Sequence, residues 1–106
     1  MKRNSSHDIK EKEVLIAIIG TLESLKRNVI SIEEAEKFLF SPYMAEMIEE
    51  KKYRPEIVHI IECGCELEDV ESLLPQKLQN SISDLQDVAL SLLKQYPMYD
   101  MERWLE

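Results

Sequence analysis

The chain has 106 residues, 44% of them apolar and 32% charged, with a formal net charge of −8. These values are typical of one globular domain with a single modest core, and they exclude disordered and fibrous chains. No apolar run approaches the roughly 20 residues that cross a bilayer, and no signal-peptide pattern follows Met1, so we expect a soluble cytoplasmic protein that does not bind membranes. Cys63 and Cys65 are too close in sequence for a framework disulfide, which fits a reducing compartment.

Two long helices are predicted, one near each end of the chain. The first is expected over roughly residues 9–28, where apolar side chains recur at spacings of three and four, as one helix face requires, up to the residue just after it: Leu15, Ile18, Leu22, Leu25 and Val29. Residues 75–95 show the same spacing: Leu78, Ile82, Leu85, Ala89 and Leu92. Because both patterns resemble heptads, we expect the two helices to pack antiparallel. Residues 1–8 are expected to form a flexible arm of the single domain 1–106.

Two short helices are predicted to follow the first long one. Ser31 and Glu34 have the spacing of a capping box. In this motif the serine hydroxyl accepts the backbone N–H of the glutamate, and the glutamate carboxylate accepts the backbone N–H of the serine. This helix should run to about Phe40. Ser41-Pro42 then starts the next helix, because serine is a good N-cap and proline needs no hydrogen-bond partner at the first helical position.

The segment after Pro55 is predicted to hold another helix and a short helix or turn. Pro55 should open a helix that ends at Cys63, with Gly64 in the left-handed conformation after it. Residues 66–74 then form a short helix or turn with three apolar side chains facing inward: Leu67, Val70 and Leu74.

The fold class predicted from these patterns is all-α, a compact bundle of about five to six helices. Tyr96-Pro97 should end the long penultimate helix, and 100–105 should form a last amphipathic turn in which Trp104 and Leu105 dock. The isoleucine- and valine-rich runs 14–19 and 57–61 could each also be a buried strand. Helix is favoured because the first run continues its period far beyond the length of a strand.

The negative charge is concentrated in one segment. Between Arg54 and Lys77 there is no Lys or Arg but there are six carboxylates: Glu56, Glu62, Glu66, Glu68, Asp69 and Glu71. A surface of this kind repels nucleic acid and attracts basic protein. The alternative is that these acids only complement helix dipoles and keep a helical bundle soluble.

The chain lacks the common motifs of catalysis and cofactor binding, such as a Gly-rich phosphate loop, a G-x-S-x-G elbow, an H-E-x-x-H pair or an EF-hand loop. His59 and Cys63 share a helix face with the spacing of some metal ligands, but a zinc site needs more ligands than this pair supplies. We therefore predict no catalytic, cofactor-binding or metal-binding residue and no cofactor, and we predict that the protein is not an enzyme.

Two strings resemble a known family. Residues 31–43, which contain F-S-P-Y, and residues 66–75, E-L-E-D-V-E-S-L-L-P, resemble a family of short, mainly Gram-positive bacterial proteins whose domain has no known function. The resemblance covers about residues 13–95. It implies a helical fold and a bacterial origin, and it brings no catalytic residue. Family members tend to carry a hydroxyl residue where Cys65 stands, which weakens any role for the cysteine pair.

Size, the absence of catalytic motifs and the localised charge favour a small protein-binding module, such as an immunity or antitoxin-type inhibitor of a basic protein. The residues expected to contact the partner are Phe40, Ser41, Tyr43, Glu66, Glu68, Asp69 and Glu71. One alternative is a homo-oligomeric, structural or regulatory helical protein, a homodimer for example. Another is a metal-dependent enzyme with a carboxylate cluster. Nucleic acid is not an expected partner, because no basic stripe exists.

Overall fold

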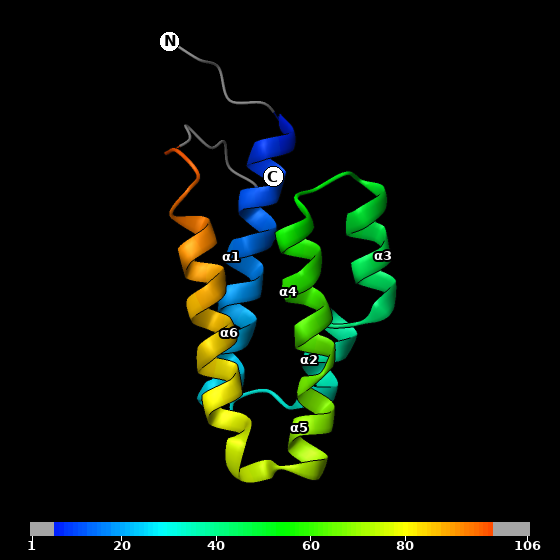
Figure 1. Cartoon of the computed structure of the whole chain (residues 1–106), viewed down its shortest axis with the longest axis vertical. Helices are drawn as coiled ribbons and strands as arrows, with labels where there is room; N and C mark the ends of the chain where they lie inside the picture. The colour runs from blue at the N-terminus through cyan, green and yellow to red at the C-terminus, as the bar shows by residue number, and fades with distance from the viewer. Residues whose placement is uncertain (1–5, 99–106) are drawn as a thin grey trace.

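A computed structural model describes residues 6–98 of the chain, and in this range it contains helices and no strand (Figure 1). The helices are α1 (Ser6–Lys26), α2 (Ile32–Phe38), α3 (Pro42–Glu50), α4 (Pro55–Cys65), α5 (Leu67–Leu73), the 3-10 helix η1 (Pro75–Lys77) and α6 (Leu78–Leu93). The all-α prediction is confirmed, and the two isoleucine-rich runs are helical. No helix in the described range is both long and apolar enough to cross a membrane.

The bundle is organised around the antiparallel pair α1 and α6, as the heptad-like spacing predicts (Figure 1). Polar contacts fix the register at both ends of the pair. Lys12 Nζ donates to the Pro97 carbonyl at 2.9 Å, and Lys26 Nζ donates to Gln86 Oε1 at 3.2 Å. Mainly apolar side chains fill the space between the two helices, and α4 closes the core over them. The largest fully buried side chains are Leu15, Ile18, Leu22, Phe40, Ile57, Ile60, Ile61 and Ile82.

The predicted caps of α2 and α3 are present. Ser31 Oγ accepts the backbone N–H of Glu34 at 3.1 Å, and Glu34 Oε1 accepts the N–H of Ser31 at 2.8 Å, which completes the capping box. Ser41 Oγ caps α3 by accepting the N–H of Met44 at 3.2 Å, with Pro42 at the first helical position. These caps allow α2 and α3 to follow each other with a break of only three residues.

Gly64 does not adopt the left-handed conformation, so that prediction is wrong. Helix α4 continues through Gly64 to Cys65, and no described glycine has a positive φ. A Cβ added at Gly64 would lie 2.4 Å from Cδ1 of Phe40, so glycine is needed there because the Phe40 ring packs directly on the helix backbone. The left-handed residues are instead Asn28 and Lys52, which follow α1 and α3 with φ of 61° and 65°.

Several predicted helix ends and inward-facing residues also need correction. Helix α1 begins at Ser6, inside the expected arm 1–8, and ends at Lys26, so Val29 lies in the following turn and is 71% exposed. Residues 75–77 form η1 rather than the start of the long helix. Leu74 is exposed because α5 ends before it. The turn expected at 100–105 lies outside the described residues.

Candidate functional site

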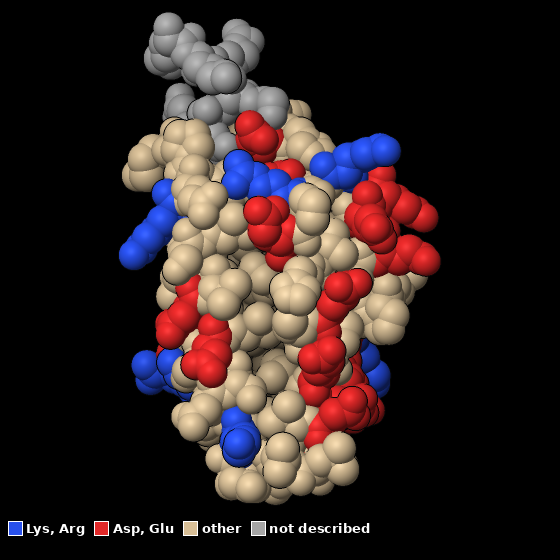
Figure 2. Space-filling model, viewed as in Figure 1, with Lys and Arg blue, Asp and Glu red and all other residues tan. Residues whose placement is uncertain are grey.

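Carboxylates from four consecutive helical segments gather on one side of the bundle, over α3, α4 and α5 in the view of Figure 2. We call this surface the acidic face and define it by Glu33, Glu36, Glu46, Glu49, Glu62, Glu66, Glu68 and Asp69. Cys65 lies at its centre, where Glu36, Glu62 and Glu66 all act on the thiol. The Glu66–Asp69 string predicted from the sequence is therefore one edge of a larger surface.

The strongest sign of crowded charge is at Glu36 of α2 and Glu68 of α5. Partial burial, followed by the hydrogen bond and negative charge of Glu68, raises the pKa of Glu36 above its ordinary value. Glu33 and Asp69 add to the same repulsion. Among residues 6–98, the ion pair found beside Glu36 and Glu68 joins Glu33 to Lys37 at 3.7 Å. Both of those side chains are 78% exposed, so this ion pair offsets little of the charge. The protein therefore holds like charges together here at a cost in stability.

A groove of about 420 Å³ runs between α3 and α4 within the acidic face. Its less polar lining consists of Pro42, Ala45 and Cys65, and its carboxylates are Glu46, Glu49, Glu62 and Glu66. This combination suits the aliphatic stem and cationic head of a lysine or arginine side chain, since such side chains lay their methylene groups on apolar surface and keep the charge among polar groups.

The remaining residues predicted to contact a partner have different environments. Tyr43 is 69% exposed at the start of α3, whereas the hydroxyl of Ser41 is used as the α3 cap. Glu71 is exposed but lines a different hollow, between the α1–α2 turn and α6. Phe40 is only 1% exposed, so its expected place on the surface is wrong: its ring fills the core above Gly64.

The surroundings of the two cysteines lower the reactivity of their thiols. Both are free and half-buried, and His59 Nε2 lies 3.6 Å from Cys63 Sγ. Burial, followed by nearby carboxylates, raises the pKa of both thiols, which keeps them protonated and weakly nucleophilic. Within residues 6–98 no group of three or more His, Cys, Asp or Glu side chains is arranged to hold a metal ion.

A buried carboxylate that the sequence reasoning missed joins three segments at one end of the bundle. Glu11 of α1 is 2% exposed, and its Oε1 accepts the hydroxyl of Tyr96 at 2.5 Å. Its Oε2 accepts the backbone N–H of Arg54 at 3.1 Å, and Arg54 Nε lies 3.5 Å from Oε1. His7 Nε2 lies 3.3 Å from Oε2. The carboxylate therefore ties α1 to the α3–α4 turn and to the segment that follows α6.

Aromatic contacts enclose this Glu11 cluster. The guanidinium of Arg54 lies over the Tyr96 ring at 4.3 Å, and the ring of His7 meets that of Tyr53 edge-on at 4.8 Å. Both Glu11 oxygens are engaged, so the arrangement favours a structural tie over a catalytic base. The signal in the sequence was the spacing of Glu11 from Leu15 and Ile18, which places the carboxylate on the core face of α1.

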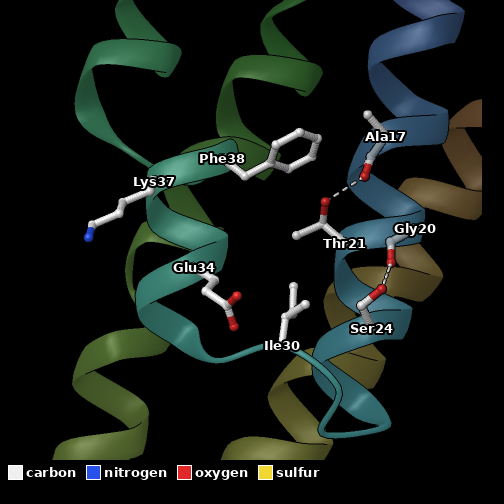
Figure 3. Close-up of a pocket in the computed structure, with 8 residues that line it drawn as sticks. All are labelled: Ala17, Gly20, Thr21, Ser24, Ile30, Glu34, Lys37 and Phe38. Atoms are coloured by element: carbon white, nitrogen blue, oxygen red, sulfur yellow. Dashed lines mark hydrogen bonds between the residues drawn. The ribbon is translucent and has the colours of Figure 1, made fainter.

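A second groove, of about 770 Å³, lies between α1 and α2 and is shown in Figure 3. Its hydroxyls are used internally: Thr21 donates to the Ala17 carbonyl and Ser24 to the Gly20 carbonyl, each at 2.8 Å. The ring of Phe38 projects toward α1, while Lys37 points away. The groove therefore presents a mainly apolar surface.

Comparison with family models decides the family. The model described as Protein of unknown function (DUF3969) matches residues 5–106, nearly the whole chain. The chain belongs to this family. Membership in DUF3969 confirms the resemblance inferred from the sequence to a domain family of unknown function. Searches of curated proteins and of solved structures gave no match.

Proposed function

We propose that this DUF3969 protein is a small protein-binding module that uses the acidic face to bind a basic protein. The observation that carries the proposal is the gathering of carboxylates from α2 to α5 on one face, where the α3–α4 groove alone is lined by four of them. Within this face, partial burial and the neighbouring Glu68 raise the pKa of Glu36. Repulsion of this kind lowers the stability of the free protein. It is relieved when a cationic partner supplies the missing positive charge.

The shape of the acidic face supports a protein partner over a bound metal ion. The carboxylates extend over four helical segments, and the groove between α3 and α4 combines four of them with apolar lining. A metal ion would need several carboxylate oxygens around one point, whereas a basic protein surface can place separate lysines and arginines along the band. An inhibitor of a basic enzyme, such as an immunity or antitoxin-type protein, needs an extended acidic surface of this kind.

Affinity capture from an extract of the native organism tests the proposal. The bait would be the wild-type chain and a variant in which four carboxylates of the acidic face become amides: Glu36→Gln, Glu62→Gln, Glu66→Gln and Glu68→Gln. A matched control would remove equal charge from another part of the surface: Asp8→Asn, Glu56→Gln, Asp84→Asn and Asp87→Asn. All eight residues are partly or fully exposed, so folding should persist.

We expect wild type and the control variant to recover the same basic protein, and the acidic-face variant to lose it. Recovery of that protein in equal amounts by the acidic-face variant would contradict the proposed surface. Loss by both variants would show that only net charge matters and would contradict it as well.

A further inference from the structure

The outer side of α1 carries a stripe of partly or fully exposed residues. Five residues at spacings of 4, 3, 4 and 3 form it: Glu13, Ala17, Gly20, Ser24 and Arg27. They point away from the buried face of the same helix, and a Cβ placed on Gly20 would meet nothing within 4 Å. Small residues at the middle of the stripe leave the helix backbone open to close approach by another helix.

The groove between α1 and α2 borders this stripe and adds apolar surface to it. Ala17, Gly20 and Ser24 belong to both the stripe and the groove wall (Figure 3). Phe38 on the far wall is 64% exposed, and Ile16 beside the stripe is 49% exposed. Because the Ser24 and Thr21 hydroxyls donate to carbonyls of their own helix, covering them leaves no hydrogen-bond donor without an acceptor. The hydroxyls of this surface can therefore be buried without losing a hydrogen bond, and the charged residues of the groove lining are Glu34 and Lys37.

The charges at the two ends of the stripe favour a second copy of this chain as its binding partner. In an antiparallel pair related by a two-fold axis at Gly20, a residue n places before Gly20 lies opposite the residue n places after it. Glu13 is seven residues before Gly20 and Arg27 is seven residues after it. The pairing of two copies therefore sets Glu13 of each against Arg27 of the other, about 10 Å from the axis at 1.5 Å per residue.

Both charged side chains are accessible for such a contact. Arg27 is 74% exposed and Glu13 is 33% exposed. Glu23 engages only Nε of the Arg27 guanidinium, which has further N–H groups to donate. Lys10 approaches Glu13 at 3.8 Å, a long distance for an ion pair. The stripe ends are thus one acid and one base. On α2, which forms the far wall of the groove, the acidic-face residues Glu33 and Glu36 lie on the opposite side of the helix from Phe38, so the acidic face stays apart in the pair.

We propose that the α1–α2 groove is a homodimer interface, in which the α1 helices of two copies of this chain cross antiparallel at Gly20 and each covers the other's groove. The two-fold arrangement makes the surface self-complementary, as a closed dimer requires. It buries Phe38 and Ile16 and leaves both acidic faces open, so one dimer would present two partner-binding surfaces.

Sedimentation equilibrium at micromolar concentration tests the dimer. We expect a mass twice the 12.4 kDa of one chain. Gly20→Arg places a long charged side chain where only open space surrounds the monomer, so we expect unchanged helicity and a dimer dissociation constant at least about tenfold higher. Ile16→Arg should weaken the dimer in the same way. Val88→Arg, at a site on α6 that is 51% exposed, is the matched control and should leave it unchanged.

A charge exchange tests the orientation. Glu13→Arg sets like charges against each other at both ends of the crossing, and we expect it to raise the dissociation constant at least about tenfold. Adding Arg27→Glu restores opposite charges and should recover most of the lost affinity. A wild-type mass of 12.4 kDa would overturn the proposal, and so would a dimer that Gly20→Arg leaves intact. Binding of the dye 1-anilinonaphthalene-8-sulfonate to a wild-type monomer would mean that the groove takes a small apolar ligand instead.

Discussion

Glu11 shows how one residue can determine the geometry of a whole end of the bundle. A carboxylate that is 2% exposed is costly to bury unless every oxygen has a partner. Here Tyr96, the Arg54 backbone and the Arg54 guanidinium supply those partners, from positions 43 and 85 residues along the chain. At this end of the bundle, hydrogen bonds between residues distant in sequence therefore hold the segments together in place of apolar packing.

We predict that Glu11→Gln lowers the free energy of unfolding by about 1–3 kcal/mol, because the amide replaces one acceptor with a donor and removes the charge that Arg54 faces. Urea unfolding at neutral pH measures the change. The exposed Asp87→Asn on α6 serves as the control and should change stability by less than about 0.5 kcal/mol. Equal effects of the two substitutions would contradict the structural role assigned to Glu11.

Tyr96 should make stability fall in alkali. Burial, followed by the hydrogen bond to Glu11 and its charge, raises the pKa of Tyr96 above its ordinary value near 10. A raised pKa in the folded state means that the stabilisation is complete below the ordinary value and is lost as pH rises through the raised one. Urea unfolding between about pH 8 and pH 11 should show this loss in wild type and in the exposed control Tyr43→Phe. A Tyr96→Phe variant with the same alkaline loss would contradict the prediction.

Glu36 should behave as a residue kept for function at the expense of stability. Its pKa is raised by burial and by Glu68, so its stabilising contribution exists at acid pH and is lost as pH rises through the raised value. We predict that Glu36→Gln increases the free energy of unfolding at pH 7 by about 0.5 kcal/mol, the scale of one like-charge contact, and reduces binding to the basic partner. Chemical denaturation gives the first quantity. A destabilised Glu36→Gln variant would show that the carboxylate is structural.

At the scale of helices, the two glycines have opposite roles. We predict that Gly64→Ala destabilises the protein by about 1–3 kcal/mol, because its Cβ would lie 2.4 Å from the Phe40 ring. Gly20→Ala should instead stabilise the fold of one chain by about 0.5–1 kcal/mol, since alanine favours helix and its Cβ meets nothing within 4 Å. Thermal unfolding followed by circular dichroism compares them. The explanation fails if Gly64→Ala is as stable as wild type.

Helix positions were largely predictable from the sequence, because apolar spacing and the Ser31, Ser41 and Pro55 start signals are local. The role of Gly64 could not be predicted from the sequence, since it depends on contact with Phe40, which is distant in sequence. The acidic residues around Glu66 could be recognised from the composition of that segment. The extension of the acidic face to Glu36 and Glu46 could not be predicted, because the sequence does not show which helices lie beside α4 and α5.

For the whole molecule, the uneven charge is the property that connects structure with function. The formal net charge of −8 is distributed so that α1 has a balanced outer stripe while α2 to α5 share the acidic face. A dimer through α1 and a partner on the acidic face can therefore coexist. Repulsion between the acidic faces is weak when they are further apart than the Debye length of about 8 Å at physiological salt.

The most direct measurement is calorimetric titration of the purified basic partner, recovered by the wild-type protein, at low and at physiological salt. We predict that wild-type affinity falls as salt rises, and that the variant with amides at Glu36, Glu62, Glu66 and Glu68 binds at least about tenfold more weakly at low salt, with less dependence on salt. Equal affinity of the two proteins at low salt would contradict the claim that the acidic face is the binding surface.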